Sequence, residues 1–156
     1  MPNVNYGFEM GMITVETPIF GYPNQAQIAN GSLPTAEIPI GIVGPGTVSV
    51  PLAAVQIHPQ VALTADNTNF LTVTVNKRTA AAPGTPVALA IATSTISGAN
   101  STGNWVAFTT FSMTLVAGAF VSPGDQITVI TTKGGTGPAV PGGLPALFLG
   151  GFMTAR

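Results

Sequence analysis

The sequence predicts an all-β fold: a jelly-roll-like sandwich of about eight antiparallel strands, preceded by an extended N-terminal arm. Hydrophobic residues recur at every second position in several stretches, as in a strand whose side chains alternate between two faces. Clusters of Gly, Pro, Asn and Asp separate these stretches at short intervals and predict turns. No stretch shows a helical period bounded by helix caps. Many short strands with frequent turns are typical of sandwiches and barrels.

The clearest strand lies within Asp66–Arg78, and we use it as the reference for the rest of the chain. Leu71, Val73 and Val75 alternate with Thr and Asn residues, so they share one face of the strand. We expect this Leu/Val face to be buried. Asp66–Asn69 in front of it is a predicted turn, because Asp and Asn side chains can bond their own backbone.

Two predicted strands precede this one. Ile38–Ile42 alternates, but Pro39 restricts it to the edge of a sheet, because proline cannot donate a ladder hydrogen bond. Thr47–His58 alternates in two phases, and the phase changes near Pro51–Ala54. An extra residue reverses the facing of every later side chain, so we expect a β-bulge or bend there.

The segment that follows the reference strand predicts a loop over 79–86 and then a strand over 87–95. The loop is rich in Ala, Pro and Gly, and the strand alternates Val, Leu and Ile with Ala. Ser97–Asn104 is a predicted exposed loop. Trp105–Leu115 is the next predicted strand, and its length favours a twist or a break midway.

The C-terminal part predicts further strands and turns. Ser122–Asp125 has Pro and Gly at the positions that a type II turn requires. Gln126–Thr132 is a predicted strand with an alternating pattern. A Gly-rich loop at 133–138 leads to a final apolar strand near Leu144–Phe152.

The chain divides into an extended arm at 1–35 and a sandwich domain at 36–156. The arm has little regular pattern apart from a strand-like Met12–Thr17. Long structureless stretches are uncommon in compact domains and are often functional. The stretch is either an extended arm or a loop packed on the domain. We favour an arm that docks on another molecule, such as a neighbouring subunit, through its aromatic residues, which are Tyr6, Phe8, Phe20 and Tyr22.

The composition limits the classes of partner. Charged residues make up 6% of the chain, against roughly 25% in an average soluble domain. The net charge is −1, so no basic field is present to attract nucleic acid or an anionic membrane. The two long uncharged windows, 38–57 and 134–155, contain Pro and Gly, so neither predicts a membrane helix. A surface with few charges favours assembly with a partner, although a secreted Thr/Asn-rich β domain is the alternative.

Residues for catalysis or for metal binding are scarce, and we expect no enzyme activity, no cofactor and no metal. The chain has no cysteine and one histidine, His58, which the pattern places at the end of a strand. A triad with Asp66 has no nucleophile motif to support it. The remaining acids are too dispersed to predict a glycosidase pair. The Gly-rich 134–143 lacks the Gly-Lys-Ser/Thr end of a phosphate loop, and Asp66–Asn69 lacks the spaced acids of a calcium loop. The start of the chain has neither the basic residues nor the apolar run of a signal peptide.

Three aromatic residues allow two interpretations. Trp105, Phe108 and Phe111 could form a stacking platform for sugars, or they could belong to the sandwich core. Alternation along a strand favours the core interpretation.

Four segments resemble those of the small decoration, or cement, proteins on the heads of tailed bacteriophages. They are T-A-D-N-T-N-F-L-T-V-T-V-N-K-R-T at 64–79, G-N-W-V-A-F-T at 103–109, S-P-G-D-Q-I-T-V at 122–129 and K-G-G-T-G-P-A-V-P at 133–141. The shared order is more specific than any one segment, and the resemblance covers roughly residues 47–150. The N-terminal third has no counterpart.

The resemblance implies a jelly-roll domain, a homotrimer and a position on the outer surface of the virion capsid at local threefold sites. It implies the major capsid protein and further copies of the chain as partners, and no enzyme activity. The alternative is a carbohydrate- or receptor-binding β-sandwich, such as a tail-fibre or head-fibre module. That alternative requires exposed rings among Trp105, Phe108 and Phe111.

Overall fold

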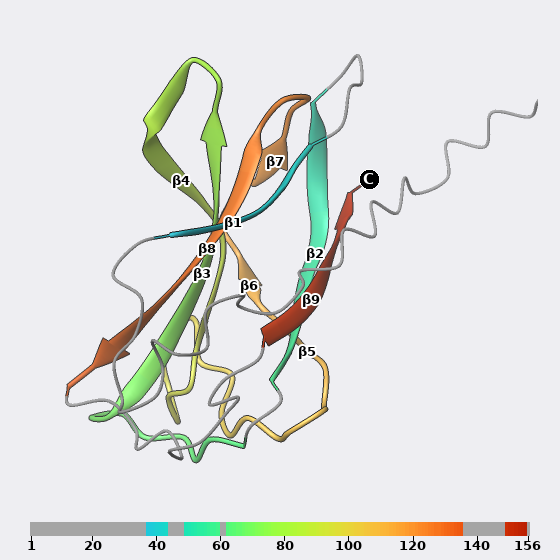
Figure 1. Cartoon of the computed structure of the whole chain (residues 1–156). Helices are drawn as coiled ribbons and strands as arrows, with labels where there is room; N and C mark the ends of the chain where they lie inside the picture. Colours follow the sequence, from blue (N-terminus) through green and yellow to red (C-terminus); the bar gives the residue numbers. More distant parts are fainter. Residues whose placement is uncertain (1–36, 44–48, 60–61, 136–148, 156) are drawn as a thin grey trace, which may run out of the picture.

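The computed structural model describes residues 37–43, 49–59, 62–135 and 149–155. These residues form two sheets of antiparallel strands that face each other (Figure 1). The predicted class, an all-β sandwich of antiparallel strands, is confirmed. The predicted arm at 1–35 lies outside the described residues, and so do its four aromatic residues, Tyr6, Phe8, Phe20 and Tyr22.

The first sheet has five strands in the order β1-β8-β3-β4-β6. They are β1 (Ile38–Ile42), β8 (Gln126–Gly134), β3 (Phe70–Thr79), β4 (Ala82–Thr93) and β6 (Thr114–Leu115). The reference strand of the sequence is thus β3, and it lies at the centre of this sheet between β8 and β4. The Pro-containing β1 lies at the edge, as predicted.

The second sheet is built on β2 (Val50–Pro59). One side of β2 pairs with β9 (Leu149–Ala155). β5 (Phe111–Ser112) and β7 (Phe120–Val121) also pair with β2, at different points along it. The pairing of β2 with β9 shifts register between Leu52 and Ala54, which confirms the predicted irregularity.

The core lies between the sheets, where the alternation along β3 predicted it. Leu71, Val73 and Val75 are fully buried. They pack with a cluster contributed by both sheets and by the connecting loops, whose other members are Leu52, Val55, Ile57, Leu63, Leu89, Ala90, Ala92, Trp105, Met113, Val121, Ile127 and Val129. Burying such side chains stabilises the fold by about 1.5–3 kcal/mol each.

The segment from β5 to β7 crosses between the two sheets and closes the sandwich along one side. Met113 donates its backbone N–H to Val55 of β2, and Val116 donates to Leu89 of β4, at 2.8 and 2.9 Å. The predicted break within Trp105–Leu115 is therefore present, although a single strand is not. The chain makes an isolated bridge at Trp105 and then two short strands, of which β5 pairs with β2 of one sheet and β6 with β4 of the other.

The predicted loop at 79–86 is a β-hairpin instead. β3 turns at residues 80 and 81, and β4 begins at Ala82, which pairs with Thr79. Pro83 and Pro86 are tolerated because β6 pairs with β4 only further along, so this part of β4 is an edge. The tip of the hairpin projects from the sandwich at the upper left of Figure 1.

The turn before β8 forms where the sequence predicted it. Asp125 donates its N–H to the carbonyl of Ser122, and Gly124 has a φ of 84°, which confirms the turn with glycine at its third position.

Most consecutive strands alternate between the sheets, as in a jelly roll. β3 and β4 instead remain together in one sheet.

Candidate interaction surfaces

The charged side chains at one end of the sandwich are neutralised internally. Lys77 Nζ lies 3.6 Å from Asp125 Oδ2, and the two side chains are only 5% and 4% exposed. The ring of Phe120 covers the ammonium group, with 3.4 Å from Nζ to the ring centroid. Asp125 Oδ2 also accepts a hydrogen bond of 2.9 Å from the Ser122 N–H. This buried pair presents no charge to a partner.

A second ionic cluster fastens β1 to the sheet. Glu37 accepts hydrogen bonds from Arg78 Nε at 2.7 Å and from Asn76 Nδ2 and Thr128 Oγ1, both at 2.6 Å. Burial alone would raise the pKa of Glu37, but the hydrogen bonds from Thr128 and Arg78, the positive charge of Arg78 and the bond from Asn76 together lower it. Arg78 Nη1 also donates to the Pro83 carbonyl at 2.5 Å, so the cluster holds the base of the hairpin.

The opposite end of the sandwich consists of loops held together by Asn and Asp side chains. Asn67 Oδ1 accepts the backbone N–H groups of Ile96 and Ser97, at 2.9 and 3.2 Å. Asp66 Oδ1 accepts those of Thr68 and Asn69, and the bond from Thr68 contributes most to lowering the pKa of Asp66. Asp66 thus shapes the predicted turn.

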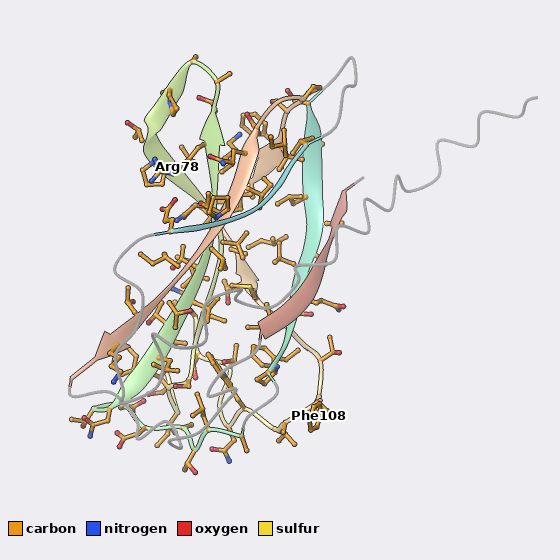
Figure 2. All side chains as sticks on the ribbon, viewed as in Figure 1. Arg78 and Phe108 are labelled. Atoms are coloured by element: carbon orange, nitrogen blue, oxygen red, sulfur yellow. The ribbon has the colours of Figure 1, made fainter. Side chains whose placement is uncertain are left out.

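Large apolar side chains are exposed at this loop end. Ile96, Val106 and Phe108 are 68%, 56% and 76% exposed. Their loops are linked, because Gly103 donates its N–H to the Thr95 carbonyl. We call these three residues the loop-end group. Figure 2 shows Phe108 at the end of the molecule remote from Arg78.

Phe108 also has an unusual backbone conformation. Its φ is 61°, and it is the only non-glycine residue with positive φ among the described residues. It occupies the third position of a turn closed by the Thr109 N–H and the Val106 carbonyl, where glycine is normally preferred. A bond of 2.7 Å from its N–H to the Pro59 carbonyl holds it there. The left-handed conformation costs roughly 1–2 kcal/mol for a residue with a side chain. Such strain at an exposed aromatic residue is typical of a functional position.

A second exposed apolar group lies at the hairpin end. Ile42, Val87 and Phe120 are 71%, 47% and 45% exposed. Val87 pairs with Lys77 on β3, and Phe120 covers the same lysine. Residues 80–87 are all exposed, and none of them is charged. We call residues 80–87 with Ile42 and Phe120 the hairpin-end group.

The three aromatic residues considered for sugar stacking do not form a common platform. Trp105 is 1% exposed, and its Nε1 donates to Thr102 Oγ1 at 2.8 Å. Phe111 packs against it, with 5.6 Å between ring centroids. Only Phe108 presents its ring to solvent. The core interpretation is therefore confirmed for Trp105 and Phe111 and is wrong for Phe108, and the stacking platform of all three is also wrong.

Sequence reasoning did not single out Ile42, Val87, Ile96 or Phe120. A sequence signal for the loop end exists, because Val106 and Phe108 lie at odd spacing from Trp105 and so fall on the opposite face of an alternating strand. No comparable signal marked the hairpin end, because its exposure depends on where β4 lies in the sheet.

The part of the chain that the structure describes contains no group of three or more His, Cys, Asp or Glu residues placed to hold a metal ion. His58 lies near the end of β2, as predicted. Across the same ranges, no helix has the length and apolar character needed to cross a membrane.

Comparisons with protein-family models, with curated proteins and with solved structures give no match to this chain.

Proposed function

We propose that this chain is a structural protein of a bacteriophage virion that binds the outer surface of the capsid and stabilises the expanded head. Its partners are the major capsid protein and further copies of itself, in a homotrimer. The observation that carries the proposal is the combination of exposed apolar groups at both ends with two ion pairs, Lys77–Asp125 and Arg78–Glu37, that neutralise the charges near the hairpin end. The four segments that resemble cement proteins give the proposal its class.

The physical basis is binding to the assembled state. A protein that binds only the assembled, expanded shell stabilises it by mass action. An interface formed by apolar side chains and backbone groups depends little on salt, because few charges are available for screening. We therefore expect binding that persists at high ionic strength.

A binding titration tests this function. Purified protein is mixed with mature heads that lack it, and bound protein is measured by co-sedimentation at low and high salt. Saturable binding of hundreds of copies per head supports the proposal. Absence of binding, or a few copies at a single vertex, would contradict it.

The alternative is a carbohydrate- or receptor-binding module of a tail fibre or head fibre. The exposed ring of Phe108 favours it, since aromatic rings can stack on sugars. A glycan-binding screen separates the two functions, with Phe108→Ser as the control variant. Glycan binding that Phe108→Ser abolishes, together with no binding to heads, would establish the alternative.

A further inference from the structure

We infer that β1 can leave the sheet while the other strands stay paired, and that the charged carboxylate of Glu37, which directly precedes β1, is the latch that holds β1 in place. Loss of this charge in acid opens the latch. The inference goes beyond the proposed function and does not depend on it. Figure 1 shows β1 beside β8, and Figure 2 labels Arg78, one of the side chains that hold Glu37.

The backbone holds β1 weakly. Among the described strands, β1 pairs with β8 alone, at the edge of the sheet. Pro39 has no N–H to donate, and the register shifts between Pro39 and Gly41. The side chains of Pro39 and Ile42 are exposed. Interrupted pairing and exposed side chains are typical of segments that open at a lower free energy than the rest of a fold.

The side chain of Glu37 supplies the hold that the backbone lacks. It reaches past β8 to β3, where its Oε1 accepts a bond of 2.6 Å from Asn76 Nδ2. Its Oε2 accepts bonds of 2.7 and 2.6 Å from Arg78 Nε on β3 and Thr128 Oγ1 on β8. Asn76 and Thr128 are only 6% and 2% exposed, so a Glu37 side chain that stops accepting would leave them buried without this partner. We call Glu37 and these three donors the Glu37 clasp.

The Glu37 clasp is matched to a charged carboxylate. Asn76 Nδ2 and Arg78 Nε can only donate, whereas a protonated carboxyl group carries a hydrogen of its own. Burial alone would raise the pKa of Glu37, but the bonds from Thr128 and Arg78, the charge of Arg78 and the bond from Asn76 hold it below its usual range. The clasp is therefore closed at neutral pH, and its contribution is lost as pH falls through the lowered pKa. Release of β1 then lets water bind the donors.

Arg78 is the charged group that faces Glu37. Lys77, the other cation of β3, follows Asn76 and precedes Arg78, so it points to the opposite face, where it is paired with Asp125. Lys133 of β8 lies beyond positions 126–129, which pair with β1. The remaining strands of this sheet, β4 and β6, contain no charged residue. Acid therefore acts on the hold of β1 through Glu37.

The rest of the sheet is paired without β1. β8 pairs with β3 along its whole length, from Gln126 to Gly134, and β3 pairs with β4 on its other side. Release of β1 leaves these pairings intact and exposes the outer backbone edge of β8. Such an edge is where an extended segment adds to a sheet through backbone hydrogen bonds. The Glu37 clasp thus controls access to this edge.

Hydrogen exchange of the full chain, measured by mass spectrometry at neutral pH and in acid, tests the inference. Peptides covering 37–43 report on β1, and they include the Val43 N–H, which is bonded to the Asp125 carbonyl at 2.8 Å. Peptides covering 71–78 report on the centre of the sheet, and all rates are corrected for the intrinsic effect of pH. Glu37→Gln puts an amide in place of the carboxylate of the clasp. Asp66→Asn is the matched control, because it removes another carboxylate with a lowered pKa at the opposite end of the sandwich.

We expect peptides covering 37–43 of the wild-type chain to be protected at neutral pH and to exchange roughly tenfold or more faster in acid, because buried donors lose their acceptor. Peptides covering 71–78 should stay protected. Glu37→Gln should show the fast exchange at 37–43 already at neutral pH, with little further change in acid, and Asp66→Asn should follow the wild type.

Fluorescence of the single tryptophan, Trp105, verifies that each variant is folded. If Glu37→Gln does not fold, Thr128→Val, which removes one hydrogen bond of the clasp, takes its place, and the wild-type comparison of the two pH values needs no substitution. Wild-type protection of 37–43 in the clasp variant at neutral pH would overturn the inference. So would an acid response that persists in Glu37→Gln, or a loss of protection that affects 37–43 and 71–78 together.

Discussion

The buried pair of Lys77 and Asp125 gives the most quantitative prediction. Each side chain is at most 5% exposed, so neither charge can recover hydration if its partner is removed. Removing one member of a buried pair typically costs about 3–5 kcal/mol, whereas replacing both by neutral residues is close to neutral. We therefore expect Lys77→Met to lower the free energy of unfolding by about 3–5 kcal/mol.

We expect a different loss of stability when Asp125 is substituted, because its carboxylate also accepts a hydrogen bond in a turn. Its Oδ2 accepts the Ser122 N–H in the turn before β8. Asp125→Asn keeps an oxygen acceptor for that bond and removes the charge, which leaves the Lys77 ammonium with only the Phe120 ring. The ring contributes roughly 2 kcal/mol when such a contact is desolvated, so we expect a loss at the lower end, about 3 kcal/mol. The double variant Lys77→Met/Asp125→Asn should lie within about 1 kcal/mol of wild type.

The assay is a double-mutant cycle by urea unfolding. Trp105 is 1% exposed and is the single tryptophan, so its emission should be blue-shifted in the folded state and should report unfolding. The two single variants and the double variant give a coupling free energy directly. A coupling below about 1 kcal/mol, the value typical of an exposed pair, would refute the reasoning.

Three further predictions concern other positions. Phe108→Gly relieves the strain of a positive φ and removes the few contacts of a mostly exposed ring, so the free energy of unfolding should stay within about 1 kcal/mol of wild type. A larger loss in urea unfolding would show that the ring stabilises the fold. Glu37→Gln should make the stability of the fold depend less on pH in the acid range. In the wild-type chain the pKa of Glu37 is lower in the folded state than in the unfolded state, so its stabilisation is present at neutral pH and is lost as pH falls through the lowered pKa. A variant whose melting temperature has the wild-type pH profile would contradict this. Gly135→Ala should lower the free energy of unfolding by more than about 1 kcal/mol, because Gly135 has a φ of 60° and an added Cβ would collide with the Thr68 carbonyl oxygen. Wild-type stability of this variant in urea unfolding would contradict the backbone conformation described for Gly135.

The alternation in the sequence was sufficient to predict the core face of β3. Leu71, Val73 and Val75 share a phase and are fully buried. Lys77 continues the same phase, but its charge argued against burial. Its partner Asp125 lies far along the chain, and only the pairing of β3 with β8 brings the two together. Pairings of this kind depend on the order of strands, which periodicity alone does not specify.

Turn chemistry explains both the success at Ser122–Asp125 and the failure at residues 79–86. Pro and Gly predicted the first turn correctly, because the backbone of a type II turn requires them. The same residue types favoured a loop after β3, yet the chain forms a hairpin there. Proline is compatible with a strand only at an edge, and whether a strand lies at an edge depends on its neighbours.

Phe108 shows a third limit of sequence reasoning. The alternation favoured a core position for Phe108 together with Trp105 and Phe111, and this prediction is wrong for Phe108, which is 76% exposed. Its positive φ had no sequence signal, because an aromatic residue is not a usual choice for that position of a turn. The strained, exposed ring became evident only from the structure.

The proposed stabilisation of the capsid is tested most directly by the thermal rupture of heads. Heads that lack the protein are saturated with it, and the temperature of DNA release is followed with a fluorescent dye. We predict that rupture shifts to higher temperature as binding saturates. Saturated heads that rupture at the same temperature as bare heads would contradict the account.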